Sequence, residues 1–162
     1  MILGKLFEKH FKEQMDKQEN VFCLRLPDPM GGFKGLANIC DFIVYKYPFL
    51  YLFELKTTSG SSLPFANISE KQFYGLKEVE EKFVTIKAGF LVWFYDKDIT
   101  YFVFPSVLHG LQQQGKKSIR YDNKDVCLIG GEKKKKYFEY NWPNFFQTME
   151  GEGCILTKNY KM

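Results

Sequence analysis

Asp41-Phe-Ile-Val-Tyr-Lys-Tyr-Pro-Phe-Leu-Tyr-Leu-Phe-Glu54-Leu-Lys56 is the stretch that decides the fold of this chain. Two apolar runs flank Tyr47-Pro48, and proline favours a turn and is rare in a central strand. The stretch is therefore predicted to form a β-hairpin in which Asp41 lies opposite Glu54. Because side chains alternate along a strand, Glu54 and Lys56 are expected on one face. Charged groups are costly in apolar surroundings unless they are paired or bind a metal, so the three side chains form a candidate site.

Two carboxylates beside an ammonium group indicate a particular chemistry. Asp41 and Glu54 can hold Mg²⁺ through oxygen ligands, with Mn²⁺ expected to substitute, and the carbonyl of Leu55 is an expected further ligand. Lys56 is expected to orient or help deprotonate a water and to offset negative charge on a phosphate. This set predicts phosphodiester hydrolysis. The alternatives are ordinary strand-end acids that face water and a plain Glu54–Lys56 salt bridge.

Length and composition fit one packed domain. The chain of 162 residues can bury a core, and its 45% hydrophobic and 18% aromatic content argues against disorder. A net charge of +4 permits a polyanionic partner without requiring one. We expect a single domain over 1–162, with a basic, aromatic extension from about residue 116.

The cysteines and the apolar segments bear on metals and on location. No two of the four cysteines have metal-ligand spacing and the chain has two histidines, so a zinc or iron–sulfur site is not expected. The first residues become charged too early for a secretory signal. No apolar run reaches the length of about 18 residues needed for a membrane span. A cytoplasmic, reduced protein without membrane contact is therefore expected.

Periodicity and turn signals predict the order α-β-β-β-α-β-β-α. The expected elements are helices over 2–17, 69–83 and 105–115 and strands over 21–26, 39–46, 50–56, 88–95 and 99–104. This order predicts an α/β fold with a mixed central sheet flanked by helices. The strands over 39–46, 50–56 and 88–95 are expected to be buried on both faces. A polar loop is expected over 57–64, a further strand over 126–129, and an aromatic segment over 137–146 that docks on the domain.

The ordered elements resemble the PD-(D/E)xK nuclease superfamily. An Asp strand, a Glu-x-Lys strand, a Ser/Phe-Pro loop and a helix with Gln72 follow a helix that bears Glu8. Within the superfamily the chain is most similar to the RecU family of Holliday junction resolvases, which includes phage-encoded members. The segments that carry the resemblance are CDFIVYK, LFELKTTSGSSLPFANISEKQ and AGFLVWFY/ITYFVF. The similarity spans roughly residues 1–147.

The resemblance implies a restriction-endonuclease-like core and a Mg²⁺-dependent endonuclease that resolves four-way DNA junctions in recombination and repair. It further implies a homodimer in a bacterial or phage-infected cell. Two departures are visible in the sequence. The family's junction-binding stalk between the first two strands corresponds here to the short segment 27–38, and Lys71 stands where a histidine often precedes the glutamine.

The resemblance implies a functional role for two further residues, and each of them also has a purely structural explanation. Glu8 would complete the metal site or hold its water shell, and the alternative is an ion pair with Lys12 one helical turn away. Gln72 would hold the scissile phosphate or steer Lys56. The alternative for Gln72 is a capping box with Ser69 at the start of its helix.

Several polar residues are candidates for DNA contact, with a solvated loop or helix face as the alternative. They are Lys34, Thr57, Thr58, Ser59, Lys71, Lys116, Lys117, Lys133 and Lys134, the last two in the basic run 133–136. Trp93 and Trp142 are expected in the core or an interface, and His10 is given no role. Two other functions stay open, namely a nuclease for duplex, flap or single-stranded DNA and a dormant DNA-binding recombination protein.

Overall fold

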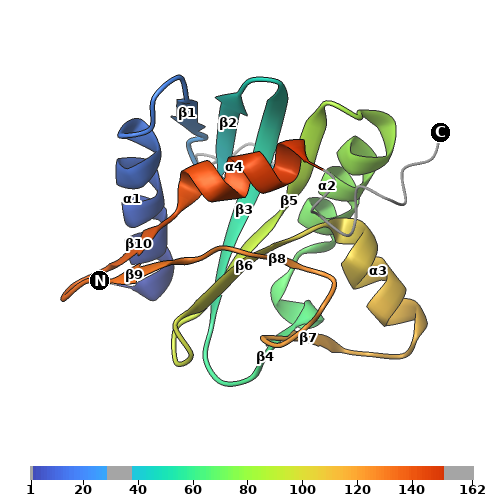
Figure 1. Ribbon diagram of the computed structural model, residues 1–162. Helices are drawn as coiled ribbons and strands as arrows, with labels where there is room; N and C mark the ends of the chain where they lie inside the picture. Colours follow the sequence, from blue (N-terminus) through green and yellow to red (C-terminus); the bar gives the residue numbers. More distant parts are fainter. Residues whose placement is uncertain (1, 29–37, 152–162) are drawn as a thin grey trace.

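The fold is an α/β arrangement built on a six-stranded mixed sheet with the order β1-β2-β3-β5-β6-β8 (Figure 1). The computed structural model describes residues 2–28 and 38–151, so Lys34 lies outside the described residues. Strands β3 and β5 pair in parallel, and the other neighbours pair antiparallel. The strands are β1 (Phe22–Arg25), β2 (Phe42–Lys46), β3 (Phe49–Thr58), β5 (Ile86–Phe94), β6 (Ile99–Val103) and β8 (Cys127–Leu128).

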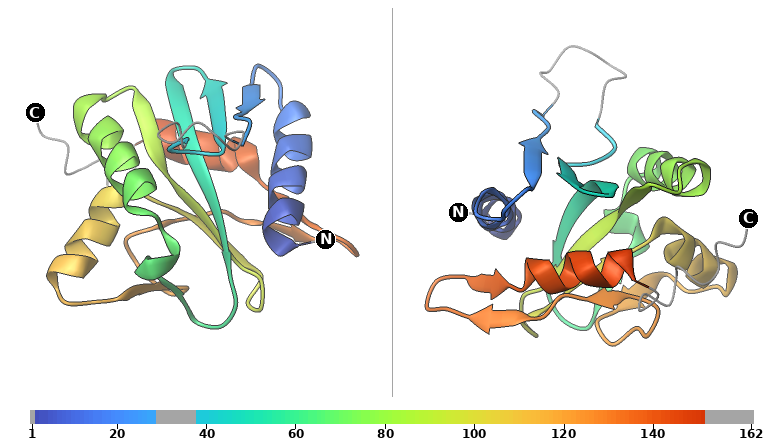
Figure 2. Two further views of the ribbon diagram at one scale, coloured as in Figure 1. Left: turned by 180° about the vertical axis from the view of Figure 1, so that it is seen from behind. Right: turned by 45° about the horizontal axis from the view of Figure 1, so that its top comes forward.

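Four helices cover the two faces of this sheet. Helices α1 and α4 share one apolar cluster with the sheet, whereas α2 and α3 share the other (Figure 2). The bounds are α1 (Leu3–Asp16), α2 (Glu70–Lys82), α3 (Pro105–Gln113) and α4 (Trp142–Glu150), with a short 3₁₀ turn η1 (Phe65–Asn67) before α2. The predicted α/β class with a mixed, helix-flanked sheet is confirmed.

Alternation along β3 separates the two cores and positions the candidate site. Tyr51, Phe53 and Leu55 pack in the cluster of α1 and α4, and Leu52 packs in the cluster of α2 and α3. Because side chains alternate, Glu54 and Lys56 lie on the α2 face. Helix α2 forms the crossover between the parallel strands β3 and β5, so its first turn passes over this face.

Burial on both faces holds for β5 and the middle of β3, and the prediction is wrong for β2. Phe42 and Val44 are buried, but Tyr45 is 44% exposed. The exposure of Tyr45 follows from the position of β2 in the sheet. Beyond β2 lies the four-residue edge strand β1, and α2 and α3 pack over β5 and its neighbours instead.

The segment 57–64 is not wholly the polar loop that its composition predicts. Strand β3 continues to Thr58, and β4 (Ser62–Pro64) pairs with β7 (Ser118–Arg120) in a separate two-stranded ribbon. Leu63 is buried opposite Ile119 in this ribbon. The partner strand lies more than fifty residues away in sequence, so local composition contains no signal for the pairing.

The extension from about residue 116 is part of the core. It contributes β8, the ribbon of β9 (Gly131–Lys133) with β10 (Phe138–Tyr140), and α4. The buried Gln14 of α1 accepts hydrogen bonds from the Tyr140 backbone N–H at 3.0 Å and the Trp142 indole at 3.2 Å. Its amide donates to the Phe138 carbonyl at 2.8 Å. The predicted docking of the aromatic segment 137–146 is confirmed, and Gln14 is the polar link that fixes it to α1.

Gly89→Ala is expected to lower the free energy of unfolding by about 3 kcal/mol, because it overpacks the sheet. A Cβ at Gly89 would lie 2.5 Å from the Val103 carbonyl oxygen and 2.7 Å from the Phe102 ring, both in β6. Gly110→Ala in α3 is the control, since its Cβ meets nothing within 4 Å. It is expected to be neutral or stabilising by about 1 kcal/mol. Urea denaturation measures both, and equal stabilities would contradict this packing.

No helix in the part of the chain that the structure describes is long and apolar enough to cross a membrane.

Candidate active site

The hairpin brings Asp41 and Glu54 together as predicted. Its strands turn at Tyr47-Pro48, and its register pairs Phe42 with Phe53. The backbone N–H of Asp41, which directly precedes β2, also donates to the Phe53 carbonyl at 2.9 Å. The Asp41 carboxylate then accepts the Leu55 N–H at 2.8 Å. Since the N–H and C=O of one strand residue project to the same edge, the Leu55 carbonyl also faces the Asp41 side.

Glu54, Lys56 and Gln72 contact one another in a closed triangle. The Lys56 ammonium lies 3.1 Å from Glu54 Oε1 and donates to Gln72 Oε1 at 3.0 Å. The Gln72 amide donates to the same Glu54 oxygen at 2.7 Å. The Glu54 side chain is 5% exposed and that of Lys56 is 19% exposed. The predicted salt bridge is therefore present, and it is held by a third residue from α2.

The position of Gln72 follows from the cap of α2. Ser69 is the N-cap, and its hydroxyl accepts the Gln72 backbone N–H at 3.2 Å. The Gln72 side chain does not make the return bond of a capping box, because its amide NH₂ donates to Glu54 and its amide oxygen accepts from Lys56. The structure therefore supports the predicted contact of Gln72 with Lys56 and not the capping box.

Burial and mutual repulsion shift the two carboxyls. Burial, then repulsion from Asp41, raises the pKa of Glu54 to about 7, and Lys56 opposes this shift. Burial also raises the pKa of Asp41, the Leu55 N–H lowers it, and the charge of Glu8 raises it again. The two carboxyls are in hydrogen-bonding contact. Among the described residues, Lys56 is the cation paired with Glu54, and the repulsion between the two acids favours a shared proton or a bound cation.

Glu8 lies near this pair but is held by a residue that the sequence analysis did not select. Arg25 on β1 donates to Glu8 Oε2 at 2.7 and 3.0 Å, and Lys5 lies 3.6 Å away. The predicted alternative is wrong, since Lys12 pairs with Asp16. Arg25 pairs with the buried Phe42, so its side chain lies on the α1 face of the sheet. The sequence alone does not predict this register between β1 and β2.

The donor set fits a small divalent cation. Asp41 and Glu54 are carboxylates in contact, and the Leu55 carbonyl supplies a third oxygen on the same edge, as Mg²⁺ prefers. Over 2–28 and 38–151, no group of three or more His, Cys, Asp or Glu side chains is placed to hold a metal. Glu8 is engaged with Arg25, so its place would be in the water shell of the ion.

The predicted DNA contacts fall into separate regions. Thr57 and Ser59 lie at the end of β3 near the site, whereas the Thr58 hydroxyl donates within its own turn to the Ser62 carbonyl at 3.1 Å. Lys71 is exposed on α2, and Lys116 and Lys117 are exposed after α3. Lys133 pairs with Asp98, and Lys134 pairs with Glu132 and Glu139, on the β9–β10 ribbon.

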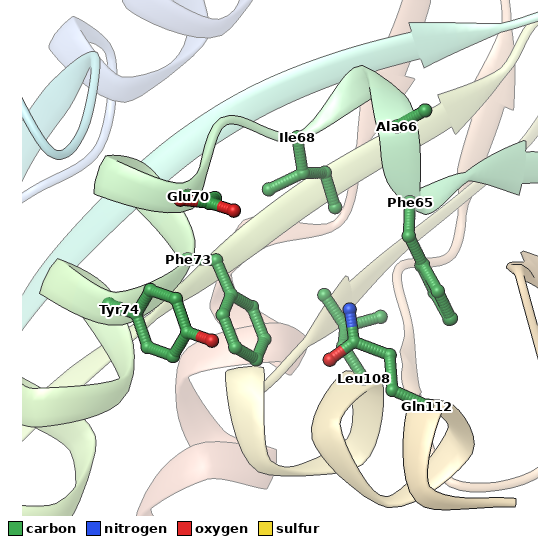
Figure 3. Close-up of a pocket in the computed structure, with 8 residues that line it drawn as sticks. All are labelled: Phe65, Ala66, Ile68, Glu70, Phe73, Tyr74, Leu108 and Gln112. Carbon is green, nitrogen blue, oxygen red and sulfur yellow. The ribbon is translucent and has the colours of Figure 1, made fainter. Parts of the chain in front are cut away.

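A cavity next to the site does not include its charged residues. It has a volume of about 360 Å³ and lies between η1, α2 and α3 (Figure 3). Phe65, Ile68, Phe73 and Leu108 form its apolar part, and Glu70, Tyr74 and Gln112 lie around it (Figure 3). The first turns of α2 thus carry Gln72 in the charged triangle and also line this mixed polar and apolar cavity through Glu70 and Phe73.

The comparisons with known proteins give no information about the function of this chain. No family model matches the chain, and no curated protein matches it.

Proposed function

We propose that this protein is a Mg²⁺-dependent endonuclease that hydrolyses phosphodiester bonds in DNA. The triangle of Glu54, Lys56 and Gln72 beside Asp41 is the observation that carries the proposal. A salt bridge between Glu54 and Lys56 within β3 that served stability alone would not need a second buried carboxylate against it, because burying like charges together costs free energy. A cation bound between the acids offsets that cost.

Each residue has a defined task in the proposed reaction. Asp41, Glu54 and the Leu55 carbonyl would hold Mg²⁺, which would supply Lewis-acid neutralisation of charge on the phosphate. Lys56, fixed by Glu54 and Gln72, orients the attacking water and offsets negative charge that develops on the phosphate oxygens. The water oxygen bonds to phosphorus as the bond to the 3′-oxygen breaks. The products carry a 5′-phosphate and a 3′-hydroxyl.

The proposed substrate is a four-way junction, and the proposed architecture is a restriction-endonuclease-like core. The support is the order of the elements, in which the Asp strand, the Glu-x-Lys strand and the Gln helix meet at one site. Cutting two strands of a symmetric junction needs two sites, which a two-fold dimer supplies. Exposed apolar residues at the β1–β2 edge are compatible with a subunit interface, among them Phe22, Leu24 and Tyr45.

Cleavage of an end-labelled four-way junction beside a linear duplex of matched sequence tests the proposal. Mg²⁺ or Mn²⁺ is expected to support paired, symmetric cuts in the junction, and EDTA is expected to abolish them. Cuts in the duplex as well would keep the site and change the substrate to general DNA. Junction binding without cuts in either metal would reject the nuclease and favour a dormant recombination protein.

A further inference from the structure

A second cavity lies on the opposite face of the sheet, where the β9–β10 ribbon meets β5 and α1. It has a volume of about 210 Å³, and its lining consists of His10, Trp93, Asp98, Lys133, Lys134, Lys135, Lys136, Tyr137 and Phe138. Trp93 packs with the cluster of α1 and α4, whereas Lys56 contacts α2 on the other face. Figures 1 and 2 place the ribbon beside α1, away from α2. The cavity is therefore separate from the candidate active site.

The charges of the lining favour an anion. Lys133 is neutralised by Asp98, and Lys134 lies 2.9 Å from Glu132 and 3.5 Å from Glu139. Lys135 and Lys136 are exposed, and no carboxylate among the described residues lies within ion-pair distance of either. Two exposed lysines of the lining are thus left without a counter-charge among the described residues, and a phosphate is the anion that such lysines bind in nucleic acids.

The rings of the lining favour a planar group attached to that anion. The His10 and Tyr137 rings lie 5.6 Å apart, and Trp93 packs against Phe7 at 5.6 Å. The indole N–H of Trp93 is buried and has no acceptor within the described part of the chain. Since this N–H has almost no accessible surface, it does not reach the cavity, and Trp93 lines the wall through other atoms. The volume corresponds to about seven waters of the liquid, which is comparable to one heterocyclic base.

We propose that this cavity binds one nucleotide of a single-stranded nucleic acid. Lys135 and Lys136 hold the phosphate, and Tyr137 and His10 offer the faces on which the base stacks. Basic residues beside aromatic rings are the usual means of holding single strands without reading their sequence. A duplex keeps its bases stacked inside, so it cannot place one in a cavity of this size. The proposal is independent of the nuclease function, because no residue of the candidate active site takes part.

Tryptophan fluorescence of the full chain in EDTA tests this site with short oligothymidylate as the probe. Trp93 reports on the cavity, whereas Trp142 is fully buried in the core. Saturable quenching is expected, and it should disappear in Trp93→Phe. An unquenched signal on saturation with oligothymidylate, as measured by anisotropy of the labelled strand, would overturn the assignment.

Two variants separate a built site from general charge attraction. Lys135→Glu/Lys136→Glu is expected to weaken oligothymidylate binding about tenfold or more, because it reverses the phosphate contacts. Lys17→Glu/Lys82→Glu makes the same change of charge at two exposed lysines outside the cavity, and its affinity should stay within about twofold. Equal weakening by both pairs would reject the site.

Tyr137→Ala tests the stacking and changes no charge. Loss of one base–aromatic stack is expected to weaken binding of the labelled strand about tenfold. Circular dichroism of the variant checks that the fold is retained. An unchanged affinity, or displacement of the strand by an equal concentration of an oligoglutamate peptide, would reject nucleotide recognition in favour of an unselective anion site.

Discussion

Lys56→Ala is expected to lower the rate of DNA cleavage about a thousandfold, because one donor aimed at developing charge in a transition state contributes about that factor. The loss should fall on kcat with little change in DNA affinity, since the role proposed for Lys56 is at the reacting phosphate and not along the length of the strand. Single-turnover cleavage measures the rate, and binding in EDTA measures the affinity.

Lys77→Ala is the matched control for this variant. Lys77 has a side chain 21% exposed, close to the 19% of Lys56, and it also pairs with a glutamate, Glu81. Both variants replace a lysine of similar burial by alanine, and both lose an ion pair. Lys77 lies on α2 and takes no part in the candidate active site. Full activity is expected for Lys77→Ala. If both variants lose the same activity, the effect is structural and Lys56 has no special role.

Asp41→Asn is expected to abolish both Mg²⁺-dependent cleavage and Mg²⁺-dependent stabilisation. At a tenfold excess over its dissociation constant, a bound ion raises the free energy of unfolding by about 1.4 kcal/mol. The asparagine keeps the shape and an oxygen for the Leu55 N–H but removes the charge that holds the cation. Thermal unfolding with and without Mg²⁺ measures this shift.

The metal-free stability of Asp41→Asn supplies a second readout. Removing one of two repelling carboxyls is expected to leave the apo protein as stable as the parent or more stable. Asp16→Asn, at an exposed position on α1, is the control and should keep the Mg²⁺ shift. A Mg²⁺ shift that persists in Asp41→Asn would place the ion elsewhere.

The sequence predicted the central elements because their signals are local. Proline at position 48 and the apolar runs on either side specify the hairpin, and alternation within it specifies the shared face of Glu54 and Lys56. Ser69 similarly specifies the start of α2. These signals act over a few residues, so they can be read without the tertiary fold.

The remaining parts of the site depend on contacts between distant segments. The Arg25–Glu8 pair requires the packing of β1 against α1, and the bonds from Gln72 to Glu54 and Lys56 require the crossover of α2 above β3. The exposed face of β2 depends on which strands the helices cover. No periodicity within one segment contains this information.

The link through Gln14 has a consequence for the time at which the protein can fold on the ribosome. Its partners lie 124 to 128 residues downstream, in Phe138, Tyr140 and Trp142. Until those residues leave the exit tunnel, the apolar cluster that α1 shares with the sheet lacks the part contributed by β10 and α4. At about 5–20 residues per second, synthesis of the intervening 124 to 128 residues takes about 6–26 seconds. The core around α1 can therefore be completed only after Trp142 has left the exit tunnel.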